Sequence, residues 1–103
     1  LAVTTAKRAK ALPKVPTLEE CGLKGFNIST WYGLFVPAKT PTATVDKLNA
    51  AFTKALRSKE VDARLDKLGG EAAPTTSAQF AALIREEITK YAKIVKISGA
   101  HVD

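Results

Sequence analysis

The sequence has few of the residues on which disulfides, metal sites and nucleophilic catalysis depend. Among 103 residues there is one cysteine, Cys21, and one histidine, His101. A single cysteine excludes a disulfide within the chain, and the lack of a Cys and His cluster leaves no predicted zinc-type site. Cys21 follows a turn-rich stretch and is expected to be a small, half-buried side chain. We expect His101, close to the end of the chain, to be exposed rather than catalytic.

Long apolar runs are absent as well. No stretch approaches the ~20 apolar residues that a membrane-spanning helix needs, and no signal-peptide pattern is present. The length is enough for one domain at most. The chain begins with "LAV" at Leu1, and we expect it to be a piece of a longer protein.

Residue patterns suited to catalysis or phosphate binding are also missing. The two glycines at 69–70 lack the G-x-G-x-x-G or G-K-[ST] surroundings of a phosphate loop. Glu86 and Glu87 are neighbours on a predicted helix and point in different directions, so they do not suit an acid–base pair. With Lys90 and Lys93 nearby, they are expected to form surface ion pairs. The sequence therefore predicts a protein that is not an enzyme and that uses no cofactor and no metal.

The charge balance is basic, with 16 Lys and Arg against 10 Asp and Glu and a formal net charge of +6. Such a balance raises the possibility of a nucleic-acid partner. However, the basic residues cluster only in "KRAK" at 7–10, and no recognition-helix or RNA-binding pattern accompanies them. A solvated basic surface is favoured. A small basic domain that binds nucleic acid or another anionic surface is the alternative.

The first part of the chain reads as extended structure and turns. The β-prone residues 1–5 predict the end of a strand, and residues 6–25 predict a connection rich in Pro and Gly. Within it, Thr17 and Glu20 have the spacing of a capping box, and Gly22 is placed to close the helical turn that follows. Residues 26–36 predict a long strand whose burial changes from one-sided to two-sided after Ser29.

This strand contains Trp31 and Tyr32, followed by Gly33. The aromatic pair fits either core packing or ligand contact, and residue type alone favours the core. A glycine weakens a strand, but it lets another backbone approach closely or lets the strand bend. The apolar run at 31–36 needs a partner surface in so short a chain.

Three helices are predicted after the strand. Thr40 and Pro41 predict the start of the first, as N-cap and first helical residue. Ser58 is expected to cap a shorter second helix that ends at the glycines 69–70. Thr76 and Gln79 form a second capping box, and an apolar stripe follows it as far as Gly99. The stripe consists of Phe80, Leu83, Ile84, Ile88, Tyr91 and Val95.

The order of several short segments is more specific than any one of them. "LAVT-x-AKR", "ALP-x-VPT", "GL-x-GF", "WYGLF-x-PA-x-TP" and "LN-x-A" occur in this order. Together they resemble the C-terminal third of the extracytoplasmic solute receptors of the tripartite tricarboxylate transporter family, the Bug or TctC-type binding proteins. The resemblance covers the whole chain. It departs at two turns, because the family often has Asp in place of Lys14 and Gly in place of Lys39.

The resemblance implies an α/β fold, namely the C-terminal part of domain 1 of a type II periplasmic-binding-protein fold with two strands and three main helices. Residues 1–5 would end an inter-domain strand, residues 6–25 would form the connection, and residues 26–103 would complete one domain. The implied ligand is a small carboxylate, such as a tricarboxylate, dicarboxylate, amino acid or aromatic acid. It would be captured in the periplasm, with the help of the N-terminal part of the receptor, and delivered to membrane permease subunits.

The resemblance also implies where ligand contacts lie. Thr30, Trp31 and Tyr32 would be near the junction of the two domains and would line the floor of the ligand cleft. Gly33 and Thr4 would act as hinge or close-approach positions. No nucleic-acid partner is implied. Because a chain of this length leaves strand edges uncovered, we expect the 31–36 surface to be covered by another copy of the chain.

Overall fold

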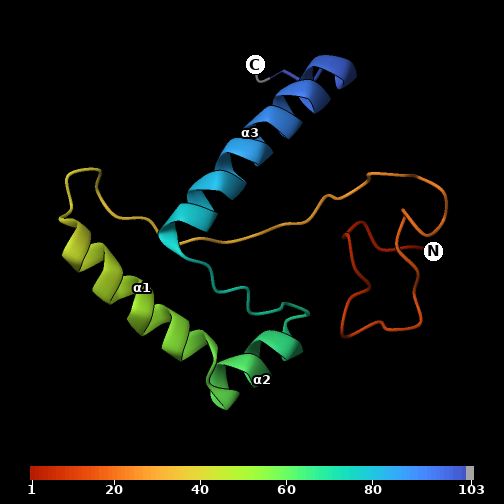
Figure 1. Ribbon diagram of the computed structural model, residues 1–103. Coiled ribbons are helices and arrows are strands. Elements are labelled where there is room, and N and C mark those ends of the chain that lie inside the picture. The colour runs from red at the N-terminus through yellow and green to blue at the C-terminus, as the bar shows by residue number, and fades with distance from the viewer. Residues whose placement is uncertain (102–103) are drawn as a thin grey trace. The chain divides into compact units, whose positions relative to one another are not determined.

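A computed structural model describes residues 1–101, and its regular secondary structure is helical (Figure 1). Helix α1 spans Thr42–Leu56, α2 spans Lys59–Lys67 and α3 spans Ser77–Ser98. The chain divides into two compact units. Unit 1 comprises Leu1–Ala38 and Lys59–Ala72, and unit 2 comprises Lys39–Ser58 and the described residues from Ala73 onward.

Helix α3 begins and ends where the sequence predicts. The backbone N–H of Gln79 donates to Thr76 Oγ1 at 3.2 Å, and the N–H of Thr76 donates to Gln79 Oε1 at 3.0 Å, so the capping box is confirmed. At the other end, Gly99 adopts the left-handed conformation with a φ of 67°. Two local sequence signals thus fix both ends of a helix of 22 residues.

Helix α2 begins directly after Ser58, as predicted, and ends in a Schellman motif at the two glycines. The N–H of Gly70 donates to the carbonyl of Leu65 at 2.9 Å, and the N–H of Gly69 donates to that of Asp66 at 3.1 Å. Gly69 has a φ of 70°. The motif needs this left-handed residue, which explains the glycine at 69.

The predicted cap of α1 is wrong by one residue. The N-cap is Pro41 rather than Thr40, and no side chain caps the helix. The ψ of Pro41 is 138°, which places it outside the helix, while its carbonyl accepts from the N–H groups of Thr44 and Val45. Within unit 2, α1 contacts α3, and Asn49 Nδ2 donates to the carbonyl of Thr75 at 2.8 Å.

The two predicted strands do not form within residues 1–101. A strand requires a neighbour that continues its hydrogen-bond ladder. Unit 1 contains one isolated parallel bridge, between Val3 and Thr17. A backbone hydrogen bond joins the two predicted strand segments, from the Ile28 N–H to the Thr4 carbonyl at 2.9 Å. Segment 26–36 then continues without regular structure to the turn before α1 (Figure 1).

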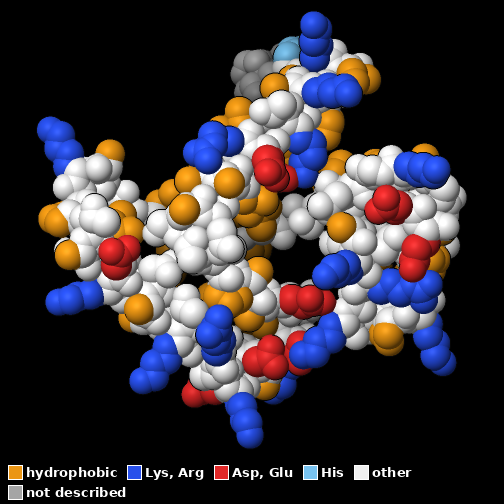
Figure 2. All heavy atoms as spheres, viewed as in Figure 1, with side chains coloured by type: hydrophobic (Ala, Val, Ile, Leu, Met, Phe, Trp, Pro, Cys, Tyr) orange, Lys and Arg blue, Asp and Glu red, His pale blue; other side chains and the backbone are white. Residues whose placement is uncertain are grey.

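Burial is also lower than the sequence predicts. No hydrophobic side chain among the described residues is buried, and Thr17, at 3% exposure, is the one buried polar residue there. The two-sided burial expected at 31–36 is therefore wrong for this chain, because Leu34, Phe35 and Val36 are exposed. Apolar side chains also reach the surface along α3 (Figure 2). Ile88 and Ile97 are among the exposed residues of this helix.

Three smaller expectations can be compared directly. Cys21 is exposed rather than half-buried, because the turn that carries it lies at the surface. His101 is exposed, as predicted, and its ring Nδ1 lies 3.3 Å from the carbonyl of Gly99. Of the expected ion pairs near Glu86 and Glu87, one forms, between Glu87 and Lys90. None of the helices in the described part of the chain is long and apolar enough to cross a membrane.

Candidate functional site

Residues 3 and 4 lie between two other segments of unit 1. On one side, the N–H of Val3 donates to the carbonyl of Pro16 at 2.8 Å, and the carbonyl of Val3 accepts from the N–H of Leu18 at 3.0 Å. On the other side, the carbonyl of Thr4 accepts from the N–H of Ile28. Successive residues of an extended segment direct their backbone groups to opposite edges, which explains why neighbours bond to different segments.

A side-chain bond supports the second of these contacts. Asn27 Oδ1 accepts a hydrogen bond from the N–H of Ala6 at 3.1 Å. Residues 4 and 6 are thus both attached to the start of segment 26–36. The structure therefore brings Thr4 close to the segment that contains Thr30, Trp31, Tyr32 and Gly33, all of them in unit 1.

The aromatic residues of this segment differ in exposure. Tyr32 is 94% exposed and Trp31 is 37% exposed, so neither packs into a core within the described residues. Thr4 and Thr30 are exposed as well. Two threonine hydroxyls, a phenol and an indole N–H can all donate hydrogen bonds to a carboxylate. None of these groups is a general base at neutral pH, so the arrangement is suited to binding rather than to proton transfer.

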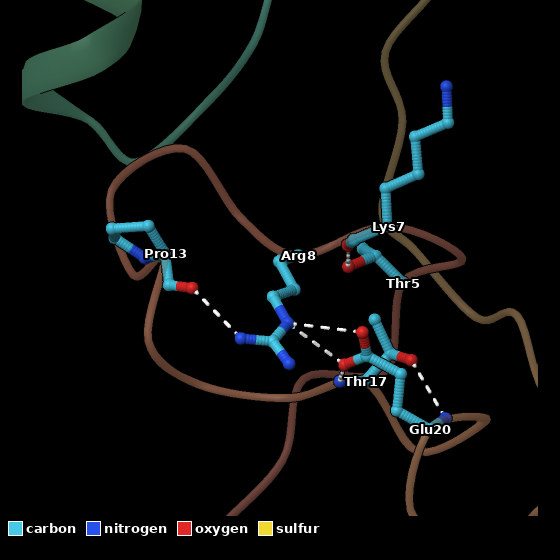
Figure 3. A network of polar contacts seen from close by, with 6 residues as sticks. All are labelled: Thr5, Lys7, Arg8, Pro13, Thr17 and Glu20. Carbon is cyan, nitrogen blue, oxygen red and sulfur yellow. Dashed lines mark hydrogen bonds and ion pairs between the residues drawn. The ribbon is translucent and has the colours of Figure 1, made fainter.

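A cluster of three residues, Arg8, Thr17 and Glu20, is joined by hydrogen bonds on the Pro-rich connection (Figure 3). We call it the Arg8–Glu20 clasp. Arg8 Nε lies 3.1 and 2.9 Å from the two carboxylate oxygens of Glu20, and Arg8 Nη1 donates to the carbonyl of Pro13 at 3.2 Å. The N–H of Thr17 donates to Glu20 Oε2 at 2.8 Å, and the N–H of Glu20 donates to Thr17 Oγ1 at 3.1 Å.

The clasp confirms the predicted capping box and adds a partner to it. Gly22 closes the turn as expected, with a φ of 102° and with its N–H donating to the Glu19 carbonyl at 3.0 Å. The backbone N–H of Thr17, followed by the Arg8 guanidinium, lowers the pKa of Glu20 below its ordinary value. Sequence reasoning missed Arg8, for which the only signal was its place in the basic cluster at 7–10.

Unit 2 contains a polar hollow of about 170 Å³. Its lining consists of Asn49, Thr53, Arg57, Pro74, Thr75, Thr76 and Gln79. Asn49, Thr76 and Gln79 already make hydrogen bonds within unit 2, so they serve to connect the loop before α3 to α1 and to cap α3. No sequence signal predicted this hollow, because its residues come from two separate segments. Among the described residues there is no group of three or more His, Cys, Asp or Glu side chains suited to a metal ion.

A family model described as "Tripartite tricarboxylate transporter family receptor" matches residues 1–100. The chain belongs to this receptor family. A protein of Pseudomonas sp. (strain P51) named for the tcbD-tcbE intergenic region is 38% identical over 96 residues, which cover 92% of this chain and 29% of that protein. Protein BugT of Bordetella pertussis is 31% identical over 100 residues, covering 97% of this chain and 31% of its own length.

Two solved structures of Rhodopseudomonas palustris proteins resemble this receptor chain closely. Rpa4515 with adipate has a TM-score of 0.79 and 32% identity, over 96% of this chain and 33% of the other. MatC (Rpa3494) with bound malate has a TM-score of 0.70 and 38% identity, over 91% of this chain and 33% of the other. The receptor chain thus spans about a third of the length of each of these two proteins.

These matches decide several predictions. The predicted family is confirmed, and it is a family of solute receptors rather than of enzymes. The receptor chain is a partial helical piece of a periplasmic-binding-protein fold. Membership in a receptor family favours this interpretation over the nucleic-acid alternative.

Proposed function

We propose that this chain is the C-terminal part of a two-domain periplasmic receptor that captures a small carboxylate for a tripartite tricarboxylate-type transporter. The observation that carries the proposal is the likeness to an adipate-bound receptor over 96% of the chain at a TM-score of 0.79. The malate-bound relative supports the same ligand class. A tricarboxylate, a dicarboxylate, an amino acid and an aromatic acid all belong to this class.

Within that receptor, the chain would complete domain 1. Residues 1–5 and 26–36 would become strands once the rest of the receptor supplies sheet neighbours, while residues 6–25 connect them. The contact between Thr4 and Ile28 supports this assignment, because it already pairs the two segments at one position. The exposed apolar residues at 31–36 would then be covered by the remainder of the domain.

Thr30, Trp31 and Tyr32 are the proposed ligand-contacting residues, with Thr4 and Gly33 as hinge or close-approach positions. Support comes from the exposure of Trp31 and Tyr32 on a segment that is bonded to Thr4 at its start. Closure of the two domains about their connecting strands would enclose the ligand, and membrane permease subunits would receive it. No nucleic-acid partner is proposed.

The test is ligand binding by the full-length receptor before and after the change Trp31→Ala. The probes are malate and adipate, and their binding is measured by calorimetry and by intrinsic fluorescence. We expect Trp31→Ala to weaken binding of the better probe by about fivefold or more, because a contacting aromatic residue contributes at least about 1 kcal/mol. Phe35→Ala, a change to another exposed aromatic residue of the same segment, is the matched control and should have a smaller effect. Unaltered affinity and an unaltered fluorescence change in the Trp31→Ala receptor would contradict the assignment.

A further inference from the structure

A short series of hydrogen bonds connects the Arg8–Glu20 clasp to segment 26–36, which contains the proposed ligand-contacting residues. Glu20 bonds to the backbone and side chain of Thr17. On either side of Thr17, Pro16 and Leu18 bond to Val3. The next residue, Thr4, bonds to Ile28, which precedes Thr30 by two positions. Every contact in the series lies in unit 1.

The clasp is unsuited to a role in stability alone. The side chains of Arg8 and Glu20 are 45% and 47% exposed, and ion pairs at such positions contribute little to the free energy of unfolding. Its contacts are nevertheless directional. Arg8 bonds to Glu20 and to the Pro13 carbonyl, and so joins the beginning, middle and end of the connection. Glu20 in turn bonds to Thr17, the buried residue that is bridged to Val3.

We propose that Arg8 and Glu20 are positioning residues for ligand binding, which hold the Val3–Thr4 segment in register and thereby orient the segment that contains Thr30, Trp31 and Tyr32. The inference rests on the proposed function. Neither side chain needs to touch the ligand. With Glu20 in place, residues 16–18 are fixed against Val3, and Thr4 is held where its carbonyl meets the N–H of Ile28. Without the clasp, the connection is free to shift, and the binding-competent arrangement is less populated.

Unit 1 also contains a matched control pair. Arg64 and Glu60 on α2 form an ion pair at 2.9 Å, and both side chains are 75% exposed. The residue types and the distance are those of the clasp, but the partners are four positions apart within one helix. Equivalent changes in this pair alter the charge of the receptor equally and leave the contacts of residues 3, 4 and 28 in place.

The experiment uses the full-length receptor with the changes Glu20→Met, Arg8→Met, both together, and the controls Glu60→Met and Arg64→Met. Methionine is chosen at position 20 because glutamine would keep an oxygen that accepts from the Thr17 N–H, as Gln79 does for Thr76. Two quantities are measured, namely the dissociation constant for malate and adipate, and the hydrogen-exchange rate of the Ile28 amide. We expect each clasp variant to raise the dissociation constant roughly three- to tenfold. Exchange at Ile28 should become faster. The double variant should lose less affinity than the sum of the two single losses, because both changes break the same Arg8–Glu20 contact.

Arg8→Lys keeps the charge, although it loses the directional guanidinium contacts, and should recover part of the affinity. If circular dichroism shows that the Arg8→Met variant does not fold, Arg8→Lys takes its place. Clasp variants that match the control variants in affinity and in Ile28 exchange would overturn the inference. A wild-type receptor that binds neither probe would instead count against the proposed ligand class, and the Ile28 exchange rate would still decide whether the clasp positions this segment.

Discussion

Lys10 Nζ lies 3.0 Å from both carboxylate oxygens of Asp66, although the two residues are 56 positions apart in the chain. Asp62 lies 3.7 Å from the same ammonium group, and the backbone N–H of Lys10 donates to Glu71 Oε1 at 3.0 Å. The Pro-rich connection is thereby joined to α2 and to the residues that follow it, all within unit 1.

This contact predicts a pH effect at the alkaline end. The hydrogen bond to Asp66, followed by the charge of Asp62, raises the pKa of Lys10 above its ordinary value. A raised lysine pKa stabilises the fold fully below the pKa of an unfolded lysine, about 10.4, and this contribution is lost as the pH rises through the higher folded value. We expect Asp66→Asn to lower the Lys10 pKa, as measured by NMR titration. Asp46→Asn on α1 is the control, and an unchanged Lys10 pKa in the Asp66→Asn protein would contradict the contact.

The clasp predicts the opposite pH effect at the acidic end. Because the Thr17 N–H and Arg8 lower the pKa of Glu20, its stabilising contribution is present above the pKa of an unfolded glutamate, about 4.3, and is lost as the pH falls through the lower folded value. Arg8→Met should move the Glu20 pKa upward, which a carboxyl-carbon NMR titration would detect. Arg64→Met should leave it where it is. Equal titration of Glu20 in both variants would show that Arg8 does not act on this carboxylate.

Removal of the capping box of α3 should destabilise the start of this helix. Thr76→Ala removes the acceptor of the Gln79 N–H and should destabilise the helix by about 1 kcal/mol. Thr89→Ala is the matched control, since the Thr89 hydroxyl bonds to the Arg85 carbonyl within the helix, where alanine is the better helix former. Circular dichroism during thermal unfolding measures both. The assignment is wrong if Thr89→Ala is the more damaging change.

The two glycines after α2 should respond differently to alanine. Gly69 has a φ of 70°, so Gly69→Ala should cost about 1–2 kcal/mol of stability. At Gly70 the new Cβ would lie 3.7 Å from the Leu65 carbonyl oxygen, an ordinary contact, and Gly70→Ala should be tolerated better. Urea unfolding of the two variants makes the comparison. Equal losses would show that the left-handed conformation at position 69 is not what matters.

Replacing Gly33 with a residue that favours strands should not make the receptor more stable or improve its ligand binding. We expect Gly33→Val in the full-length receptor to impair packing or domain closure, because valine prevents close approach of another backbone. Ser29→Val, in the same segment, is the control for the effect of a β-branched residue alone. Thermal unfolding and malate or adipate binding are the measurements. Higher thermal stability together with unchanged binding would leave this glycine without an explanation.

The exposed apolar surface of residues 31–36 predicts self-association when the chain of 103 residues is studied alone. Light scattering at increasing concentration should detect dimers or larger species. Leu34→Glu should shift the population toward the monomer, whereas Leu68→Glu, at another exposed apolar position just after the end of α2, should have less effect. A strictly monomeric wild-type chain at high concentration would exclude this association.

Local signals in the sequence determined the helices and their ends. The capping boxes at Thr17 and Thr76 and the positive-φ glycines at 22, 69 and 99 were predictable, because each depends on residues that are close in the sequence. The one error of this kind, the cap of α1, was a displacement by one residue. The ordered segments from "LAVT" to "LN-x-A" were also sufficient to identify the receptor family.

Contacts between distant residues were decided only by the tertiary structure. The partners of Arg8 and Lys10, the placement of Val3 and Thr4 between two segments, and the polar hollow in unit 2 have no local pattern. The strand expected at 26–36 depends on neighbours along its whole length, and among residues 1–101 it has a backbone partner at Ile28 but forms no ladder. Helix ends are encoded within a turn or two of the chain, whereas sheets, burial and side-chain clusters require that separate segments come together.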